Sequence, residues 1–532
     1  MQSRRSFLIN TLRVAGGIAL ASCAPTGPAA SPAAPSAAGA SAAPNIVKKG
    51  GKLVYADWGD AISMDPAYLT NTCGRRPGRA IYDSLVDVDP QGKVIPVLAE
   101  SWDIPDTKTY VLHLRKGVKF HDGTTFDAEA VKFNIDRFTD KKTKSNHASE
   151  LEGVAAVDVV DANTVRFRLK SPSVAFLQLL YDWNGFIASP TAVQRWGNND
   201  FGQHAVGAGP FRFVEHRDAV HTVVERDPDY WDPSRPYLDQ IEFKPVQADA
   251  TREIEVRSGT SHIGETMPFQ DIEKLKAMPE LVVVQVPGAR VYLPYFQPQQ
   301  SPYGKSLEFR QALNWLIDRE AIWKSVFFNT GVIGFDPFPP GSPFYDASYK
   351  PFTRDVNKAK ALLEAAYRGG VPSPAKFTLY TNSEPVTQKL AQIVQANYAE
   401  VGVTMDLQLE DTAATTARAS KGDFVFALNS TSYVSYRPDP SQYLSRYWHS
   451  TTNYIKWPYK DPEVDKLLDT GIAESDPAKR RTIYRQLADR LNVNAQTIFL
   501  GFGSDIKGMS PKVKGFIPHP DQVTRFKDMW LE

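Results

Sequence analysis

The side chains that could perform acid–base or metal chemistry are scattered along this chain. Of its nine histidines, the two closest in sequence are His216 and His221, in a predicted β region. Within one strand their odd spacing would place the rings on opposite faces of the sheet, which does not suit a shared metal ion. The sequence contains no Gly-x-Ser-x-Gly elbow, His-Glu-x-x-His helix or phosphate-binding P-loop. We therefore expect no catalytic residue, no metal and no cofactor, and we expect that the protein is not an enzyme.

Aromatic and polar residues near predicted strand ends and loops are better suited to holding a small molecule. The segment from Tyr433 to Trp448 is the richest in such side chains. The candidate ligand contacts are Trp58, Trp183, Asn184, Tyr436, Arg437, Asp439 and Trp448. For each aromatic ring, packing in the hydrophobic core is an equally good explanation. The guanidinium of Arg437 would either hold a carboxylate or phosphate or lie on the surface.

The first residues of the chain have the pattern of an export signal. Arg4 and Arg5 precede a short apolar run from Val14 to Ala21, and the paired arginines indicate twin-arginine export. The run is far shorter than the roughly 20 residues that cross a bilayer. We therefore expect residues 1–23 to be a cleaved signal peptide and not a transmembrane anchor.

Cys23 ends the sequence Leu20-Ala21-Ser22-Cys23, which resembles the lipobox of bacterial lipoproteins. The resemblance implies cleavage before Cys23 and attachment of a lipid to it. The alternative is an ordinary thiol in a disordered tail. Every residue from Ala24 to Pro44 is Ala, Pro, Ser, Gly or Thr, which cannot bury enough apolar surface to fold. Residues 24–47 are therefore predicted to be a disordered linker.

The remaining residues have the composition of a globular body. Hydrophobic residues make up 42% of the chain, and 61 basic residues balance 60 acidic ones. Balanced charge creates no broad field for nucleic acid, so we expect no nucleic-acid partner, and we expect a monomer. Only two cysteines occur, so a lipidated Cys23 would leave Cys73 without a disulfide partner.

Short apolar strands alternate with amphipathic helices along the body, which predicts an α/β fold. Strands are predicted at residues 52–55, 110–114, 211–214, 241–243, 281–284 and 403–409, and a hairpin at 157–169. Helices are predicted over 308–317, 386–398 and 478–491, and also after Asp127, Asp318 and Asp355, which are suitable N-caps. Gly402 stands where a left-handed residue would end the helix at 386–398.

Several segments together point to one protein family. Residues 99–102 read AESW, and residues 110–138 read YVLHLRKGVKFHDGTTFDAEAVKFNIDRF. These segments closely resemble the family 5 extracellular solute-binding proteins of ABC importers. Further matches follow in the expected order at 207–211, 229–231, 309–319, 461–465 and 514–516. The resemblance implies a periplasmic-binding-protein-like type II fold, with two lobes around a ligand cleft and an extra subdomain inserted in lobe one.

The same resemblance implies the division of the chain. Lobe one would comprise residues 48–287, with the inserted subdomain at about 70–185, and the C-terminal return at 501–532. Lobe two would comprise residues 288–500. The chain would cross between the lobes near 286–288 and 501–503, where the glycines suit a hinge or a plain turn equally well.

The resemblance also implies a function, that of an extracytoplasmic lipoprotein which captures a small solute and delivers it to an ABC permease complex. It would work in the periplasm or on the outer cell surface, anchored to the membrane by its lipid. A peptide is the family's default ligand. By spacing from Asp439-Pro440, however, Tyr436 takes the place of the aspartate that receives the ligand's amine in peptide-binding relatives. An opine, an oligosaccharide or a metal chelate is therefore an alternative ligand, and a surface chaperone is an alternative function.

Overall fold

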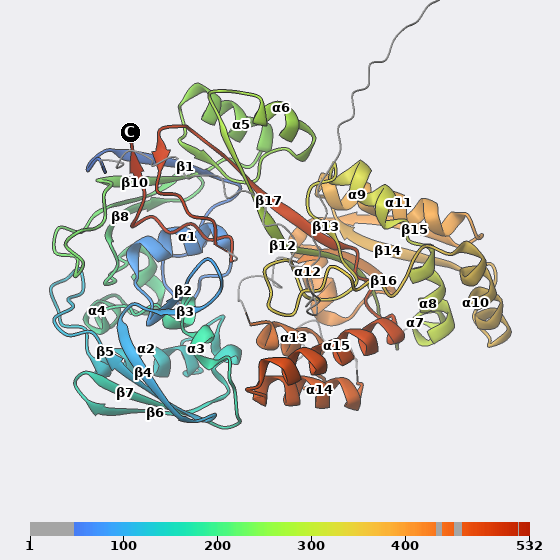
Figure 1. Ribbon diagram of the computed structural model, residues 1–532, viewed down its shortest axis with the longest axis horizontal. Helices are drawn as coiled ribbons and strands as arrows, with labels where there is room; N and C mark the ends of the chain where they lie inside the picture. The colour runs from blue at the N-terminus through green and yellow to red at the C-terminus, as the bar shows by residue number, and fades with distance from the viewer. Residues whose placement is uncertain (1–46, 300, 432–438, 452–459, 520) are drawn as a thin grey trace, which may run out of the picture. The chain divides into compact units, whose positions relative to one another are not determined.

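A mixed sheet of eleven strands forms the frame of the folded body in this computed structural model (Figure 1). The structure describes residues 47–299, 301–431, 439–451, 460–519 and 521–532, and residues 47–532 cluster as one unit. The strands are β1 (Lys52–Asp57), β8 (Phe211–Arg217), β9 (His221–Arg226), β10 (Gln240–Pro245), β11 (Ile263–Gly264), β12 (Val282–Phe296), β13 (Val332–Ile333), β14 (Lys376–Asn382), β15 (Thr404–Glu410), β16 (Phe426–Thr431) and β17 (Gly501–Met509). Their order is β15-β14-β16-β12-β17-β11-β1-β10-β9-β8, and β13 pairs with β17.

The long antiparallel strands β12 and β17 connect the two halves of this sheet. They pair from Val282 opposite Met509 to Tyr292 opposite Gly501, with a register shift between Val286 and Arg290. The strand predicted at 281–284 is therefore much longer than expected. The strand continues through the register shift between Val286 and Arg290, where the hydrogen-bond ladder is interrupted. The two predicted crossing points lie within these strands, and their role as a hinge stays a prediction.

Gly288 and Gly503 show why glycine is needed at this register shift. A side chain at Gly288 would collide with the backbone carbonyl of Gly503. The two strands thus approach more closely than any other residue type would allow.

A separate antiparallel sheet has the order β4-β5-β7-β6. Its strands are β4 (Ala99–Asp106), β5 (Thr109–Leu114), β6 (Val154–Asp161) and β7 (Thr164–Leu169). Helix α2 (Ala128–Thr139) packs on it through a core that includes Val131, Ile135 and Phe138, the three residues predicted to share one helical face. Two short ribbons complete the β structure: β2 (Val86–Val88) with β3 (Val94–Pro96), and β18 (Val513–Lys514) with β19 (Trp530–Leu531).

The helices lie between and beside these strands (Figure 1). Besides α2, they are α1 (Thr72–Ile81), α3 (Phe176–Leu179), α4 (Pro190–Asp200), α5 (Asp249–Ser258), α6 (Ile272–Lys276), α7 (Pro302–Lys305), α8 (Leu307–Leu316), α9 (Arg319–Val326), α10 (Val356–Arg368), α11 (Pro385–Ala399), α12 (Thr412–Lys421), α13 (Ser441–Trp448), α14 (Pro462–Ala473) and α15 (Pro477–Asn494). Short 3-10 turns are η1 (Ala148–Leu151), η2 (Trp183–Gly185), η3 (Phe201–Gln203) and η4 (Phe269–Asp271). Among the described residues, no helix has the length and apolar character needed to cross a membrane.

The local signals in the sequence are confirmed. The carboxylates of Asp127, Asp318 and Asp355 accept hydrogen bonds from the third backbone N–H after them and cap α2, α9 and α10. Gly402 has the expected positive φ of 77°. These signals succeed because a cap or a turn depends only on neighbouring residues.

The prediction that the spacing of His216 and His221 places their rings on opposite faces of one strand is wrong. They lie on two neighbouring antiparallel strands, β8 and β9, and not on one, so the odd-spacing rule does not apply to them. His216 instead bonds the Thr222 hydroxyl through Nδ1 at 2.8 Å, and His221 bonds Glu215 at 2.9 Å. Among the described residues, no group of three or more His, Cys, Asp or Glu could hold a metal ion.

Candidate functional site

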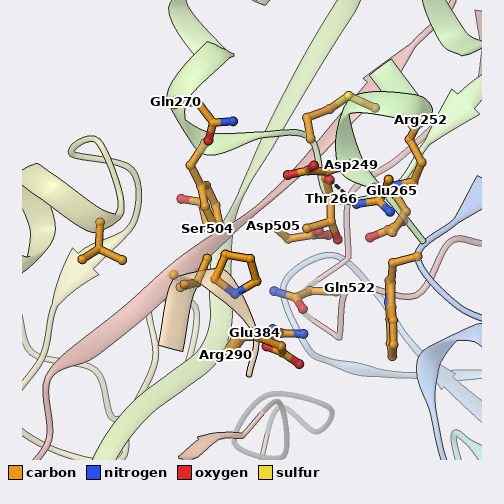
Figure 2. A pocket seen from close by; sticks show the side chains of 18 of the residues that line it. Asp249, Arg252, Glu265, Thr266, Gln270, Arg290, Glu384, Ser504, Asp505 and Gln522 are labelled. Carbon is orange, nitrogen blue, oxygen red and sulfur yellow. Dashed lines mark hydrogen bonds and ion pairs between the residues drawn. The ribbon is translucent and has the colours of Figure 1, made fainter. Parts of the chain in front are cut away.

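A cavity of about 760 Å³ lies beside the strands β12 and β17 (Figure 2). Segments from both halves of the large sheet line it, and β12 and β17 themselves contribute Arg290, Tyr292, Ser504 and Asp505. The volume falls in the range of small-molecule sites. The cavity is thus built where the two halves of the sheet are joined.

A network of buried ionic side chains lies at one wall of the cavity, and three of its members, Arg76, Glu265 and Asp505, line the cavity. We call this set the cavity network, and it consists of Tyr55, Asp57, Arg76, Glu265, Asp505 and Lys507. The guanidinium of Arg76 lies 2.5 Å from Asp57 and 3.0 Å from Glu265. The ammonium of Lys507 lies 2.5 Å from both Glu265 and Asp505, and the Tyr55 hydroxyl donates to Glu265. Asp505 and Lys507 meet because alternate residues of β17 share a face.

The cavity network has three carboxyl groups and only two cations, and this imbalance shapes its pKa values. Burial and the neighbouring charge of Glu265 raise the pKa of Asp505 to about 6, although Lys507 opposes them. Burial also raises the pKa of Asp57. For Glu265, burial is outweighed by Arg76 and Lys507, which lower its pKa to about 2. One carboxyl on the cavity wall therefore titrates close to neutral pH.

Arg252 also lines the cavity, but its guanidinium is committed to the backbone. It is buried and donates to the carbonyls of Val246 at 2.6 Å, Gln247 at 2.9 Å, Glu265 at 2.5 Å and Thr266 at 2.8 Å. These bonds tie the segment after β10 to the segment after β11. Arg252 therefore shapes the wall and has little capacity left for an anionic ligand.

The opposite wall carries exposed charged and aromatic groups. Arg290 lies 3.8 Å from Glu384, and the ammonium of Lys389 lies 5.3 Å from the ring centre of Phe328. Phe328 on this wall is 44% exposed, and Trp58 on the β1 side is 37% exposed; both line the cavity. Such rings offer apolar faces to a ligand at a low cost in conformational entropy.

The predicted ligand contacts are distributed over several places. Trp58 lines the cavity directly after β1. Trp183 and Asn184 are buried instead, and both donate to the Glu150 carboxylate, at 3.0 Å and 2.6 Å. The Trp183 ring also stacks on His147 and lies under the guanidinium of Arg75. Neither Trp183 nor Asn184 lines the cavity.

The later candidates lie in the packed interior or outside the described residues. Asp439 forms a buried ion pair with Arg480, and Trp448 is 1% exposed within an aromatic core cluster. Both are held by intramolecular partners, and neither lines the cavity. Tyr436, Arg437 and the predicted lipidation site Cys23 fall outside the described residues.

The residues that sequence reasoning missed are mainly charged. Glu265, Asp505, Arg290 and Glu384 carry no local motif. The best available signal was the alternation of Asp505 and Lys507 along one strand, since two charges on one buried face must find partners. The complete lining, unlike the cavity network alone, carries as many cations as carboxyl groups, together with aromatic rings and neutral polar side chains.

The sequence and the fold of this chain both match those of known solute-binding proteins. Residues 93–454 match the model of the bacterial extracellular solute-binding proteins, family 5 Middle. The glutathione-binding protein GsiB of Pectobacterium atrosepticum is 29% identical over 487 residues, which cover 88% of this chain and 91% of that protein.

Two solved structures are each 28% identical to this chain with a TM-score of 0.80, and each alignment covers 91% of this chain and 99% of the other. One is the periplasmic binding protein DppA from Helicobacter pylori in complex with the peptide STSA. The other is the binding protein AgaA from A. tumefaciens R10 in complex with agropinic acid. The predicted type II fold with two lobes is therefore confirmed.

Proposed function

This chain belongs to family 5 of the bacterial extracellular solute-binding proteins, and from that premise we propose that it captures a peptide-like solute in the cavity of Figure 2 and hands it unchanged to an ABC permease. The observation that carries the proposal is the lining of the cavity. Trp58 and Arg76 come from the β1 side of the large sheet, whereas Phe328 and Glu384 come from the β14 side.

Capture follows from this two-sided lining. A solute that touches both sides gains all of its contacts only when the lobes are closed, so binding shifts the population toward the closed form. We propose that lobe one comprises residues 48–287 and 501–532, with a subdomain inserted at about 70–185, and that lobe two comprises 288–500. The paired strands β12 and β17 would then carry the hinge, and the permease would recognise the closed form.

The charges on the lining support a solute without a large net charge. Four cations, Arg76, Arg252, Arg290 and Lys389, balance four carboxyl groups, Asp249, Glu265, Glu384 and Asp505. A short peptide or an amino-acid conjugate has this property. The names of the relatives point the same way, since they include binders of glutathione, of a tetrapeptide and of an opine. Of the ligand contacts predicted from the sequence, Trp58 enters this proposal.

The location of the protein is the second part of the proposal. Residues 1–23 would direct twin-arginine export, and a lipid on Cys23 would hold the monomeric body at the membrane through the linker at 24–47. A tether of this kind keeps the local concentration near the permease high. Replacement of Cys23 by serine should release the protein from the membrane fraction, and retention of the variant there would contradict the lipid anchor.

The test of capture is a thermal-shift screen of the purified protein. The panel contains glutathione, the tetrapeptide Ser-Thr-Ser-Ala, agropinic acid, an oligosaccharide and a metal chelate. A true ligand at a hundred times its dissociation constant should add about 2.7 kcal/mol to stability, and mass spectrometry should recover it unchanged. A shift with agropinic acid alone would favour an opine, and conversion of any solute to a product would contradict a binding function. Absence of any shift, together with protection of an aggregating client, would favour a chaperone.

A further inference from the structure

Strained backbone is concentrated at the cavity. In the described part of the chain, seven residues other than glycine have positive φ, and three of them line the cavity: Thr266 at 53°, Phe328 at 50° and Gln522 at 60°. They come from three separate segments, after β11, after α9 and near the C-terminus. A left-handed conformation is unfavourable for side chains of these types, most of all for the β-branched Thr266. It persists only where the surroundings impose it.

Thr266 is held in place by Arg252. The guanidinium of Arg252 donates to the carbonyl of Thr266 at 2.8 Å and to that of Glu265 at 2.5 Å. It is anchored in turn by the carbonyls of Val246 and Gln247. Figure 2 shows Arg252 beside Glu265 and Thr266 at one side of the cavity. The strained peptide is therefore fixed by a buried side chain that also ties this segment to the one after β10.

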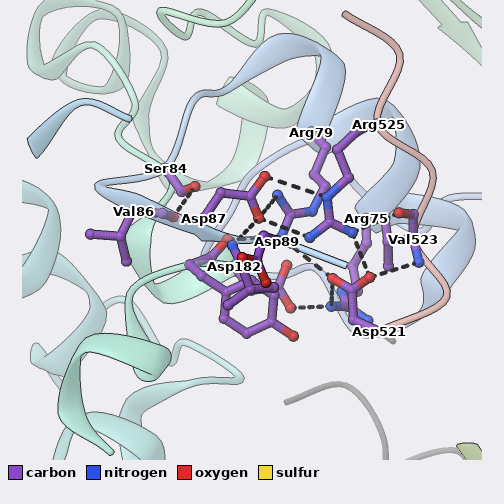
Figure 3. A network of polar contacts seen from close by, with 12 residues as sticks. Arg75, Arg79, Ser84, Val86, Asp87, Asp89, Asp182, Asp521, Val523 and Arg525 are labelled. Atoms are coloured by element: carbon purple, nitrogen blue, oxygen red, sulfur yellow. Dashed lines mark hydrogen bonds and ion pairs between the residues drawn. The ribbon is translucent and has the colours of Figure 1, made fainter. Parts of the chain in front are cut away.

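Gln522 is held from both sides by Arg525. The carboxylate of Asp521 is fully buried and lies 2.5 Å from the guanidinium of Arg525, which also donates to the carbonyl of Val523 at 2.7 Å. Asp521 additionally lies 3.6 Å from Arg79 (Figure 3). The residues on either side of Gln522 are thus clamped, whereas its own side chain lies in the cavity (Figure 2).

Phe328 is presented by a short closed turn. The N–H of Asn329 donates to the carbonyl of Trp323 at 3.0 Å, and that of Thr330 to Phe327 at 2.8 Å. Phe327 lies in the hydrophobic core, but Phe328 is 44% exposed on the cavity wall. Burial of the ring in the core therefore does not explain why the backbone of Phe328 is held at a positive φ.

We infer that Thr266, Phe328 and Gln522 determine the specificity of the cavity, and that the strain is retained because each turn aims a side chain at the solute. This inference rests on the proposed function. The hydroxyl of Thr266 and the amide of Gln522 suit uncharged amide or hydroxyl groups of the solute, and the Phe328 ring suits an adjacent apolar part. The side chains of Arg76, Glu265 and Asp505 already have ion-pair partners within the protein, so we assign this part of the solute to neutral hydrogen bonds.

Glycine substitution separates this role from a structural one, because glycine adopts positive φ without strain. Thr266→Gly, Phe328→Gly and Gln522→Gly are compared with Lys144→Gly, since Lys144 is exposed, has φ of 53° and does not line the cavity. The melting temperature is measured without ligand, and the affinity by calorimetry with glutathione and with Ser-Thr-Ser-Ala. Gln522→Asn is added because asparagine tolerates the left-handed region and keeps the amide, but shortens the side chain.

The three cavity variants should melt at or slightly above the wild-type temperature, by about 1 °C, and should bind the probe at least tenfold more weakly. Lys144→Gly should match their melting behaviour and bind as the wild type does. Gln522→Asn should also weaken binding, because its amide no longer reaches the solute. Unchanged affinity in the cavity variants would overturn the inference, as would a melting temperature well below that of Lys144→Gly.

A wild-type protein that binds neither probe would contradict the proposed peptide-like ligand instead. In that case the melting temperatures of the ligand-free variants still decide whether strain is stored at the cavity, and a loss of stability in all three would overturn the inference.

Discussion

Two buried ionic networks meet at helix α1, and they differ in how their charges balance. Arg76 of α1 belongs to the cavity network, with two cations and three carboxyl groups. Arg75 and Arg79 of the same helix belong to a second set, which we call the sealed network: Arg75, Arg79, Asp87, Asp182, Asp521 and Arg525 (Figure 3). It pairs three cations with three carboxylates, and each of these side chains is at most 8% exposed.

The balance of charge decides what each network does to its carboxyl groups. In the sealed network, Arg525 and Arg79 outweigh burial and lower the pKa of Asp521 to about 2, and they also lower the pKa of Asp87. In the cavity network, burial and the excess negative charge raise the pKa of Asp505 to about 6. Burial is similar in both places. The number of nearby cations therefore decides the difference: Asp87 and Asp521 of the sealed network stay ionised at neutral pH, whereas a carboxyl of the cavity network can take up a proton.

Asp521→Asn should have the largest effect, because it breaks the sealed network. Loss of this carboxylate leaves Arg525 and Arg79 buried without full compensation, which costs about 3–5 kcal/mol. Denaturant unfolding at pH 7.5 measures the loss. Asp158→Asn is the control, since Asp158 pairs with Arg166 and Arg168 on the surface and should cost less than about 1 kcal/mol. Equal losses of unfolding free energy in the two variants would contradict the distinction between the buried sealed network and a surface ion pair.

Trp58→Ala should affect binding more than folding, because this ring lies on the cavity side. Its indole is 37% exposed, so we expect affinity for a bound solute to fall about tenfold, corresponding to roughly 1.4 kcal/mol. Trp183→Ala provides the contrast, since its ring is buried against Arg75 of the sealed network. It should lower stability by about 3–5 kcal/mol. Calorimetry and thermal unfolding of both variants test this assignment, which fails if Trp58→Ala binds as the wild type does.

Asp505→Asn should change the pH dependence of stability. The folded-state pKa of about 6 lies above the ordinary value of 3.8, so the folded protein takes up a proton that the unfolded chain lacks. The stabilising contribution of this carboxyl is complete below about pH 4 and is lost as the pH rises through 6. Relative to wild type, the variant should therefore gain stability from pH 4.5 to 7.5, on the order of 1 kcal/mol. Parallel stability curves for the two proteins would refute the titration of Asp505.

His519→Gln should show the opposite pH dependence. Burial and then the charge of Arg525 lower the pKa of His519 from 6.5 to about 4. As the pH falls from 6.5 toward 4, the unfolded chain binds a proton that the folded protein does not, so wild-type stability declines. The variant lacks this decline and should overtake the wild type in acid. Unfolding midpoints at pH 7.5 and 5.0 provide the measurement, and an identical decline in both proteins would exclude His519 as its source.

The sequence was most informative where structure is local. Asp127, Asp318 and Asp355 cap helices as predicted, because a cap needs only the next turn of backbone. Trp58 was singled out by its place after a strand, and it lines the cavity; its contact with a ligand stays a prediction. Trp183 and Trp448 are likewise surrounded in the sequence by aromatic and polar residues, yet both side chains are buried in the structure. An aromatic ring after a strand or in a loop suits a core and a cavity equally well, and only packing distinguishes the two.

By itself, the sequence determined the local elements, the family motifs from residue 99 to 516 and the balanced overall charge. The tertiary structure decided which charges meet. Tyr55 and Glu265 are 210 residues apart in sequence, Glu265 and Lys507 are 242 apart, and Asp87 and Arg525 are 438 apart. Periodicity in a sequence reports the faces of one helix or strand. The pairing of side chains across such separations depends on the packing of whole segments. That packing gave the cavity network, at Arg76 of α1, one carboxyl more than its cations, and gave the sealed network, at Arg75 and Arg79 of the same helix, equal numbers of both.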